Sequence, residues 1–264
     1  VAGYKDVLRP PKSKPDVTYW LNALLEDGES NWAAINTAVE ATTLNERTFC
    51  LRSQDKFLRD NIRPEDVLIV SVGGNDVALL PCPCTIASIL CVVCCLPPSV
   101  TERGFSCCTL PCDDCCCGCG PSLCSCLGAC PPCLGYFRHL FGTRVQHYVN
   151  ALTAKTKPSM ILVAMIYYPD ERPAPGWAEP ALAALGYNRD PSRLQTLIRR
   201  IFAEATSRID GAIPVPLFHV LNGKNSDDYI QRVEPSVSGG RKMAEFLLEY
   251  MRRAPTPGTI QGRD

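Results

Sequence analysis

Residues 66–76, DVLIVSVGGND, place a run of apolar and mostly β-branched residues directly before a polar turn. An apolar run of this kind is typical of a strand in a parallel sheet that is covered on both faces. Gly73 and Gly74 end the run, and Asn75 and Asp76 follow them. Ligands bind at the carboxyl ends of strands in open parallel sheets, so the sequence predicts chemistry at this turn. The same four residues also occur in ordinary strand-to-loop turns. The tetrapeptide alone therefore does not distinguish a catalytic turn from a structural one, and the rest of the sequence is needed.

The rest of the chain alternates between strand-like and helix-like segments. We expect strands near residues 33–39, 66–72, 159–167 and 213–217, with helices between them and after the last one. This alternation predicts an α/β fold in which parallel strands form one sheet with helices on both faces. The expected organisation is one α/β domain in two parts, residues 1–80 and 135–253, a cysteine-rich insertion at 81–134, and a disordered tail at 254–264.

The composition excludes several classes of protein. Apolar residues make up 46% of the 264 residues, which is enough for a sizeable core. The 27 basic and 27 acidic residues balance, so nothing indicates a nucleic acid or an anionic membrane surface as partner. No stretch reaches the roughly 18 to 20 uninterrupted apolar residues that cross a bilayer, so a transmembrane segment is not expected.

Sixteen of the 17 cysteines lie between Cys82 and Cys133. Several are spaced C-x-x-C, which lets a turn direct two thiolates at one zinc ion; such pairs are Cys112 with Cys115, Cys116 with Cys119, and Cys130 with Cys133. Disulfides are an alternative, and so is S-acylation with membrane contact through TIASILCVVCC. Bound metal would favour a cytoplasmic location and disulfides a secretory one. The insertion directly follows the GGND turn, so it is placed to act as a lid or to shape an acyl pocket.

Three segments resemble conserved blocks of the SGNH/GDSL hydrolases. DVLIVSVGGNDVAL, residues 66–79, resembles the third block, and INTAVEATT, residues 35–43, resembles the second. YIQRVEPSVSGGRKMAEF, residues 229–246, looks like the fifth. The resemblance implies a three-layer α/β/α fold with a parallel, flavodoxin-like sheet, and hydrolysis of carboxylic (acyl) esters with a small ester or lipid-like substrate.

The resemblance also assigns roles to individual residues. Asn75 matches the asparagine of the oxyanion hole, Gly73 belongs to the same block, and Gly74 and Asp76 support it. Ala41 stands where the family has an oxyanion glycine, and an alanine still offers a backbone N–H if the loop tolerates its Cβ.

The fifth block departs from the family pattern at two positions. Glu234 stands in place of the catalytic histidine, and Gln231 in place of the aspartate that orients it. A glutamate carboxyl with an ordinary pKa of about 4.3 is a poorer acceptor of a serine proton at neutral pH than an imidazole with a pKa of about 6.5. Glu234 is therefore either a substituted base or a structural carboxylate. His219 follows the last expected strand but is out of register with the family histidine.

The family's nucleophile is the serine of a G-D-S motif at the end of its first strand, and VAGY, residues 1–4, resembles the residues that follow such a serine. We therefore expect the sequence to start just after the nucleophile. Because the family's first strand is central, we also expect a gap or a substitute between the strands beginning near 33 and 66. Two hypotheses remain: a catalytically impaired SGNH-type ester hydrolase, and a non-catalytic protein that uses the fold as a platform for the cysteine-rich module.

Overall fold

The computed structural model describes residues 15–27, 31–79, 83–90, 93, 99 and 136–253. The α-helices among these residues are α2 (Val17–Asp27), α3 (Ser53–Asn61), α4 (Gly74–Ala78), α5 (Pro83–Leu90), α9 (Val145–Leu152), α10 (Glu179–Ala184), α11 (Pro191–Glu204) and α12 (Val237–Arg253). A π-helical segment, His139–Arg144, leads directly into α9.

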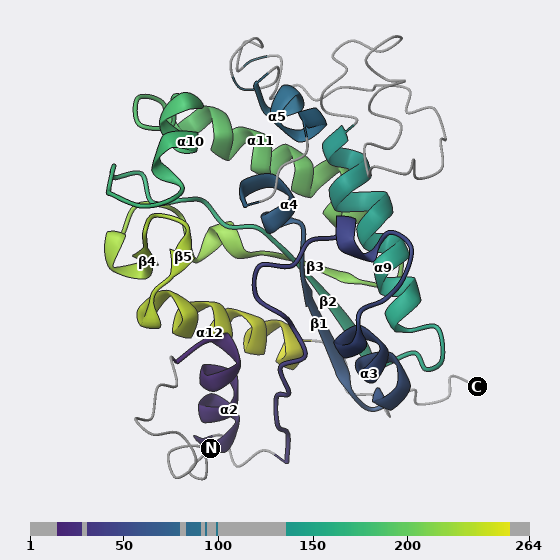
Figure 1. The fold of residues 1–264 in the computed structure, drawn as a ribbon. Helices are drawn as coiled ribbons and strands as arrows, with labels where there is room; N and C mark the ends of the chain where they lie inside the picture. Colours follow the sequence, from purple (N-terminus) through teal and green to yellow (C-terminus); the bar gives the residue numbers. More distant parts are fainter. Residues whose placement is uncertain are drawn as a thin grey trace, which may run out of the picture.

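Three parallel strands form the sheet, in the order β1 (Val67–Ser71), β2 (Met160–Met165) and β3 (Ile213–Pro216). Val67 of β1 lies opposite Met160 of β2, and Leu162 of β2 lies opposite Ile213 of β3. The strands predicted near 66–72, 159–167 and 213–217 are therefore confirmed as parallel neighbours, and the fold is mixed α/β (Figure 1). The segments before and after the cysteine-rich stretch share this one sheet.

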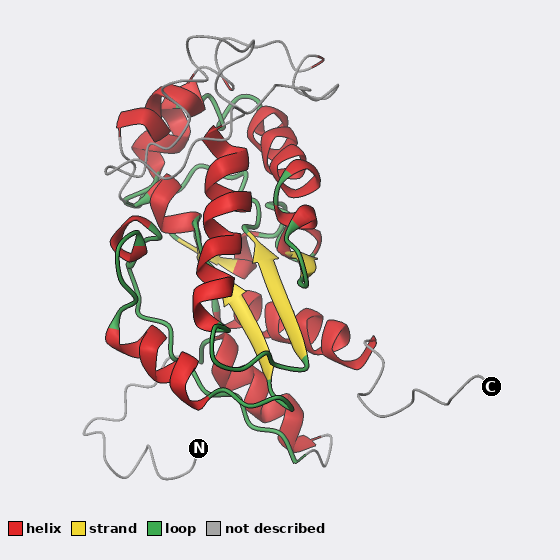
Figure 2. Ribbon diagram, turned by 90° about the vertical axis from the view of Figure 1, so that its right-hand side faces the viewer, coloured by secondary structure: helices red, strands yellow, loops and turns green. Residues whose placement is uncertain are grey.

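Alternate side chains of the strands face two separate apolar clusters. On one face Leu68 and Val70 of β1 pack with side chains from α9 and α11. On the other, Leu162 and Ala164 of β2 pack with side chains from α2 and α12. Helices therefore cover both faces, and in Figure 2 the yellow strands lie in the middle of the molecule. This explains the nearly continuous apolar runs of β1 and β2, because a strand buried on both faces has no solvent-exposed face on which polar residues would alternate with apolar ones.

The prediction of a strand near residues 33–39 is wrong. These residues belong to no strand. Instead of hydrogen bonds to a neighbouring strand, the backbone of Ala34 makes two hydrogen bonds with the Asn22 side chain of α2. The Asn22 side chain accepts from the Ala34 N–H at 2.8 Å and donates to the Ala34 carbonyl oxygen at 3.0 Å. The side chain of Ile35 is 79% exposed. The apolar pattern is strand-like, but no described strand lies beside it to complete a ladder.

A short hairpin, β4 (Tyr229–Ile230) and β5 (Glu234–Pro235), precedes α12. Gly239, in the first turns of α12, allows the 3-10 turn that ends at Asp228, directly before the hairpin, to approach closely, because a Cβ at this position would lie 2.2 Å from the Asp228 carbonyl oxygen. No helix within the described ranges is both long and apolar enough to cross a membrane.

Candidate functional site

The GGND turn follows β1 directly and begins the short helix α4. Gly73 is buried with a φ of 92°, in the left-handed region that favours glycine. A Cβ at Gly73 would lie 2.7 Å from Cε1 of Phe141, so the turn also needs the glycine for space. Backbone conformation and packing at Gly73 together fix the position at which α4 begins, and with it the positions of Gly74, Asn75 and Asp76.

Asn75 joins this turn to the loop that contains Ala41. Its Nδ2 donates a hydrogen bond to the Thr42 carbonyl oxygen at 2.9 Å, across 33 residues of sequence. Ala41 itself is exposed and has a φ of 60°, the conformation that a glycine adopts more readily. The structure thus brings together two of the three segments that carry the family resemblance, and Ala41 holds a glycine-like backbone.

The Asp76 side chain binds the backbone of the same loop a few residues after Ala41. It accepts from the Leu44 N–H at 2.9 Å and from the Asn45 N–H at 3.1 Å, and the residue is only 1% exposed. Burial raises the pKa of the Asp76 carboxyl, while the two N–H groups and the positive charge of Arg144 act in the opposite direction. Asp76 is a structural support for the loop.

Two buried arginines that the sequence analysis missed complete this support. Arg144 donates to the Asn45 side chain at 2.7 Å and to the Thr48 hydroxyl at 3.0 Å. Arg47 pairs with Asp55 at 2.9 Å, with both side chains less than a tenth exposed. Sequence reasoning had no signal for either pair, because the arginines look like any surface residue until their partners are known.

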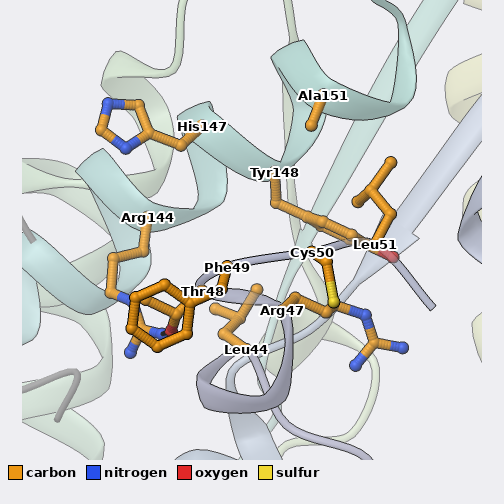
Figure 3. Close-up of a pocket in the computed structure, with 10 residues that line it drawn as sticks. All are labelled: Leu44, Arg47, Thr48, Phe49, Cys50, Leu51, Arg144, His147, Tyr148 and Ala151. Carbon is orange, nitrogen blue, oxygen red and sulfur yellow. Dashed lines mark hydrogen bonds between the residues drawn. The ribbon is translucent and has the colours of Figure 1, made fainter. Parts of the chain in front are cut away.

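A cavity of about 290 Å³ lies beside this loop, between it and α9 (Figure 3). It is lined by Leu44, Arg47, Thr48, Phe49, Cys50, Leu51, Arg144, His147, Tyr148 and Ala151. Figure 3 shows the Arg47 and Arg144 guanidinium groups pointing to opposite sides of it. The hydroxyl of Tyr148 donates to Asp55 at 2.8 Å, so much of the polar lining is already satisfied by neighbours within the protein.

Glu234 lies in β5 and is exposed. The hydroxyl of Tyr167, two residues beyond the end of β2, donates to the Val233 carbonyl oxygen at 2.7 Å. Burial raises the pKa of Tyr167, and the negative charge of Glu234 raises it further. Glu234 is thereby placed near the carboxyl end of β2, the neighbour of β1. No hydrogen bond among the described residues joins Glu234 to Asn75 or to the loop at Ala41.

The hairpin that carries Glu234 is anchored by Arg232. This arginine is fully buried with a φ of 72°, and its guanidinium donates to the Asp170 carbonyl oxygen at 3.1 and 2.8 Å. It also pairs with Glu179 and donates to Asn188 at 2.7 Å. Gln231, at the position of the family aspartate, is exposed with a φ of 49°. Four contacts from Arg232 hold this backbone in an unfavourable conformation.

The histidines lie away from the positions that the resemblance assigns. His219 is exposed just after β3, edge-on to the ring of Phe218. His139 is buried in the π-helical segment, and His147 is exposed on α9 at the cavity.

The cysteines proposed as zinc ligands, Cys112, Cys115, Cys116, Cys119, Cys130 and Cys133, lie outside the described residues. Within the described part of the chain, no group of three or more histidine, cysteine, aspartate or glutamate side chains is placed to hold a metal ion. The zinc hypothesis therefore remains a prediction.

Comparison of the chain with protein-family models, with curated proteins and with solved structures found no match.

Proposed function

We propose that the chain forms an SGNH/GDSL-like hydrolase domain with a three-layer, flavodoxin-like α/β/α fold, and that its site acts on carboxylic esters. The observation that supports this most strongly is the hydrogen bond from Asn75 to the Thr42 carbonyl oxygen. Two segments that resemble different family blocks meet through it at the carboxyl end of the sheet, where ligands of parallel sheets bind.

The chemistry follows from the two N–H donors at this point. An asparagine amide carries two hydrogens, and the one given to Thr42 fixes the direction of the other. No acceptor among the described residues takes that second hydrogen or the Ala41 N–H, so both can bind a negatively charged oxygen. Such preorganised donors stabilise the oxyanion that forms when a nucleophile adds to an acyl carbon.

The proposal requires a serine and a base. The sequence contains no G-D-S motif. The proposed nucleophile is therefore the serine of a G-D-S segment that has to be added to this chain, as in the fusion described below. Its hydroxyl oxygen adds to the acyl carbon while Glu234 accepts the hydroxyl proton. The tetrahedral intermediate then releases the alcohol, which takes that proton from Glu234. Water subsequently adds to the acyl-serine by the same route and frees the acid.

The second candidate is a non-catalytic protein that presents the cysteine-rich module. One observation favours it: Glu234 is exposed, and no hydrogen bond or ion pair from the described residues orients its carboxylate. A general base normally needs a partner that fixes its direction.

Hydrolysis of 4-nitrophenyl acetate separates the two candidates. The chain is compared with a fusion that places a G-D-S segment before Val1, and with a matched fusion carrying G-D-A. We expect no turnover from the chain or from the G-D-A fusion, and slow turnover from the G-D-S fusion. Equal rates for the G-D-S and G-D-A fusions, with both folded, would remove the ester hydrolase proposal.

A further inference from the structure

The cavity between the loop and α9 carries positive charge without an acidic side chain in its wall. All ten residues that line it belong to the described part of the chain, and none of them is acidic. On one side of the cavity, Arg47 is neutralised by its ion pair with Asp55 at 2.9 Å. On the other side, Arg144 forms no ion pair with any of the described residues. Arg144 is therefore the charge that a ligand in this cavity meets.

Arg144 is a buried cation whose hydrogen-bond acceptors are neutral. It is 4% exposed, and its guanidinium donates to the Asn45 side chain and to the Thr48 hydroxyl. These bonds use two of the five N–H groups of a guanidinium. The charges of Arg144 and Asp76 influence each other without an ion pair, because the Asp76 oxygens accept from the N–H groups of Leu44 and Asn45. Buried charges in proteins are normally paired, so an anion at Arg144 would complete a pairing that the described residues leave open.

Most of the remaining wall is apolar. Arg144, Tyr148 and Ala151 recur at i, i+4 and i+7, so they lie on one face of the helix, and in Figure 3 all three side chains leave it toward the loop. Seven residues of helix span about 10 Å. From the loop side, Leu44 belongs to the main apolar cluster and Leu51 packs against that cluster. The cavity therefore has a cation at one end of the helix face and apolar groups along the rest.

We infer that this cavity binds a small organic monocarboxylate with an apolar body. Its volume of about 290 Å³ is roughly ten times the ~30 Å³ that one water molecule occupies in the liquid, which suits a ligand of about ten non-hydrogen atoms. The planar guanidinium of Arg144 matches a carboxylate, which accepts two parallel N–H···O bonds. The apolar body lies along Tyr148 toward Ala151. Phe49 lines the cavity and is 82% exposed, so the bound ligand covers part of its ring.

Isothermal titration calorimetry of the chain with 3-phenylpropanoate tests the inference. Two control ligands separate the contributions: 3-phenylpropanamide keeps the shape and removes the charge, and inorganic phosphate keeps an anion and removes the apolar body. We expect one equivalent of 3-phenylpropanoate to bind, and both control ligands to bind at least tenfold more weakly.

Variants locate the binding in this cavity. Ala151→Leu fills the apolar end without touching Arg144 and should weaken binding at least tenfold. Its matched control is Ala154→Leu, at an exposed residue just after α9 that does not line the cavity, which should keep the parent affinity. Arg144→Gln should also weaken binding at least tenfold, and Arg144→Lys should recover part of the loss, because it keeps the charge without the planar fork. Thermal melting followed by circular dichroism checks that each variant is folded. If Arg144→Gln does not fold, Ala151→Leu decides the location.

Four results would overturn the inference. The first is the absence of saturable binding of 3-phenylpropanoate to the parent chain. The second is binding that Ala151→Leu leaves unchanged, which would place the ligand elsewhere. The third is equal affinity for the amide, which would remove the role of the charge. The fourth is equal affinity for phosphate, which would show a site for simple anions.

The inference is independent of the proposed ester chemistry. None of the residues assigned to that chemistry, Asn75, Ala41 and Glu234, lines the cavity. The titration also uses the chain without an added G-D-S serine, so the two proposals fail separately.

Discussion

The Asn75 side chain donates a hydrogen bond to the Thr42 carbonyl oxygen at 2.9 Å. This bond ties the turn after β1 to the loop whose backbone adopts a left-handed conformation at Ala41. Close packing of Gly73 against the Phe141 ring fixes the position of this turn. Hydrogen bonds of the loop with Asp76 and Arg144 fix the position of the loop. The candidate oxyanion site is therefore built on groups whose positions other contacts determine, which is the condition for preorganised stabilisation of charge.

Gly73→Ala should destabilise the protein by about 2 to 4 kcal/mol, because it adds strain at a φ of 92° to a clash with Phe141. Gly211→Ala is the matched control: its φ is 72°, but the nearest atom to an added Cβ is Lys157 Nζ at 3.8 Å, so about 1 kcal/mol is expected. Urea unfolding measures both. Phe141→Leu should recover part of the loss in Gly73→Ala and none in Gly211→Ala; equal losses for the two glycines would exclude the clash.

Asp76→Ala should reduce the free energy of unfolding by about 2 to 5 kcal/mol, because it leaves the N–H groups of Leu44 and Asn45 without an acceptor. Asp76→Asn should cost less, since its amide oxygen still accepts one of them. Asp227→Ala, at an exposed aspartate, is the control and should change little. A loss for Asp76→Ala no larger than the control would contradict the supporting role of Asp76.

Stability should fall above pH 10. Burial raises the pKa of four tyrosines above the ordinary value of 10.0: Tyr148, Tyr167, Tyr187 and Tyr229. As pH rises past 10, the unfolded chain releases these protons while the folded protein keeps them, so unfolding becomes progressively more favourable. Tyrosinate absorbance followed together with circular dichroism checks this. The four should ionise only as the protein unfolds; their ionisation in the intact fold would contradict their burial.

Purification under reducing conditions should yield protein with zinc at stoichiometric levels, if thiolates of the cysteine-rich segment form sites of the C-x-x-C kind. Elemental analysis with thiol titration measures this. The double variant Cys112→Ser/Cys115→Ser should contain less metal, whereas Cys50→Ser, outside the segment, should match the parent protein. Metal-free protein in which the sixteen cysteines between Cys82 and Cys133 are all paired would show disulfides instead of zinc sites and would favour a secretory location.

Much of the sheet could be predicted from sequence because its strands are buried on both faces. The apolar runs that contain β1, β2 and β3 indicated strands, and alternation with helices indicated parallel order. The same reasoning failed at residues 33–39. Their pattern is equally apolar, but a strand also needs a neighbour, and sequence periodicity carries no information about which neighbours are present.

Some residues of the candidate site could likewise be predicted from sequence, and others could not. Local signals in the GGND turn identified Gly73, Asn75 and Asp76, because a glycine pair after an apolar run marks a tight turn. Arg144 and Arg232 had no such signal. Their partners lie up to 99 and 62 residues away along the chain, and only the folded structure shows that these charges are buried and paired.

Steady-state hydrolysis of 4-nitrophenyl acetate by variants of the G-D-S fusion tests the central claim most directly. Asn75→Ala should lower kcat by about one hundredfold to one thousandfold, the usual effect of removing an oxyanion donor. Glu234→Gln should abolish turnover, and Glu234→His should raise it by supplying a group that titrates near neutrality. Glu245→Gln, at an exposed position of α12, serves as the control and should match the parent fusion. Turnover unchanged by both Asn75→Ala and Glu234→Gln would contradict the assignment of this site.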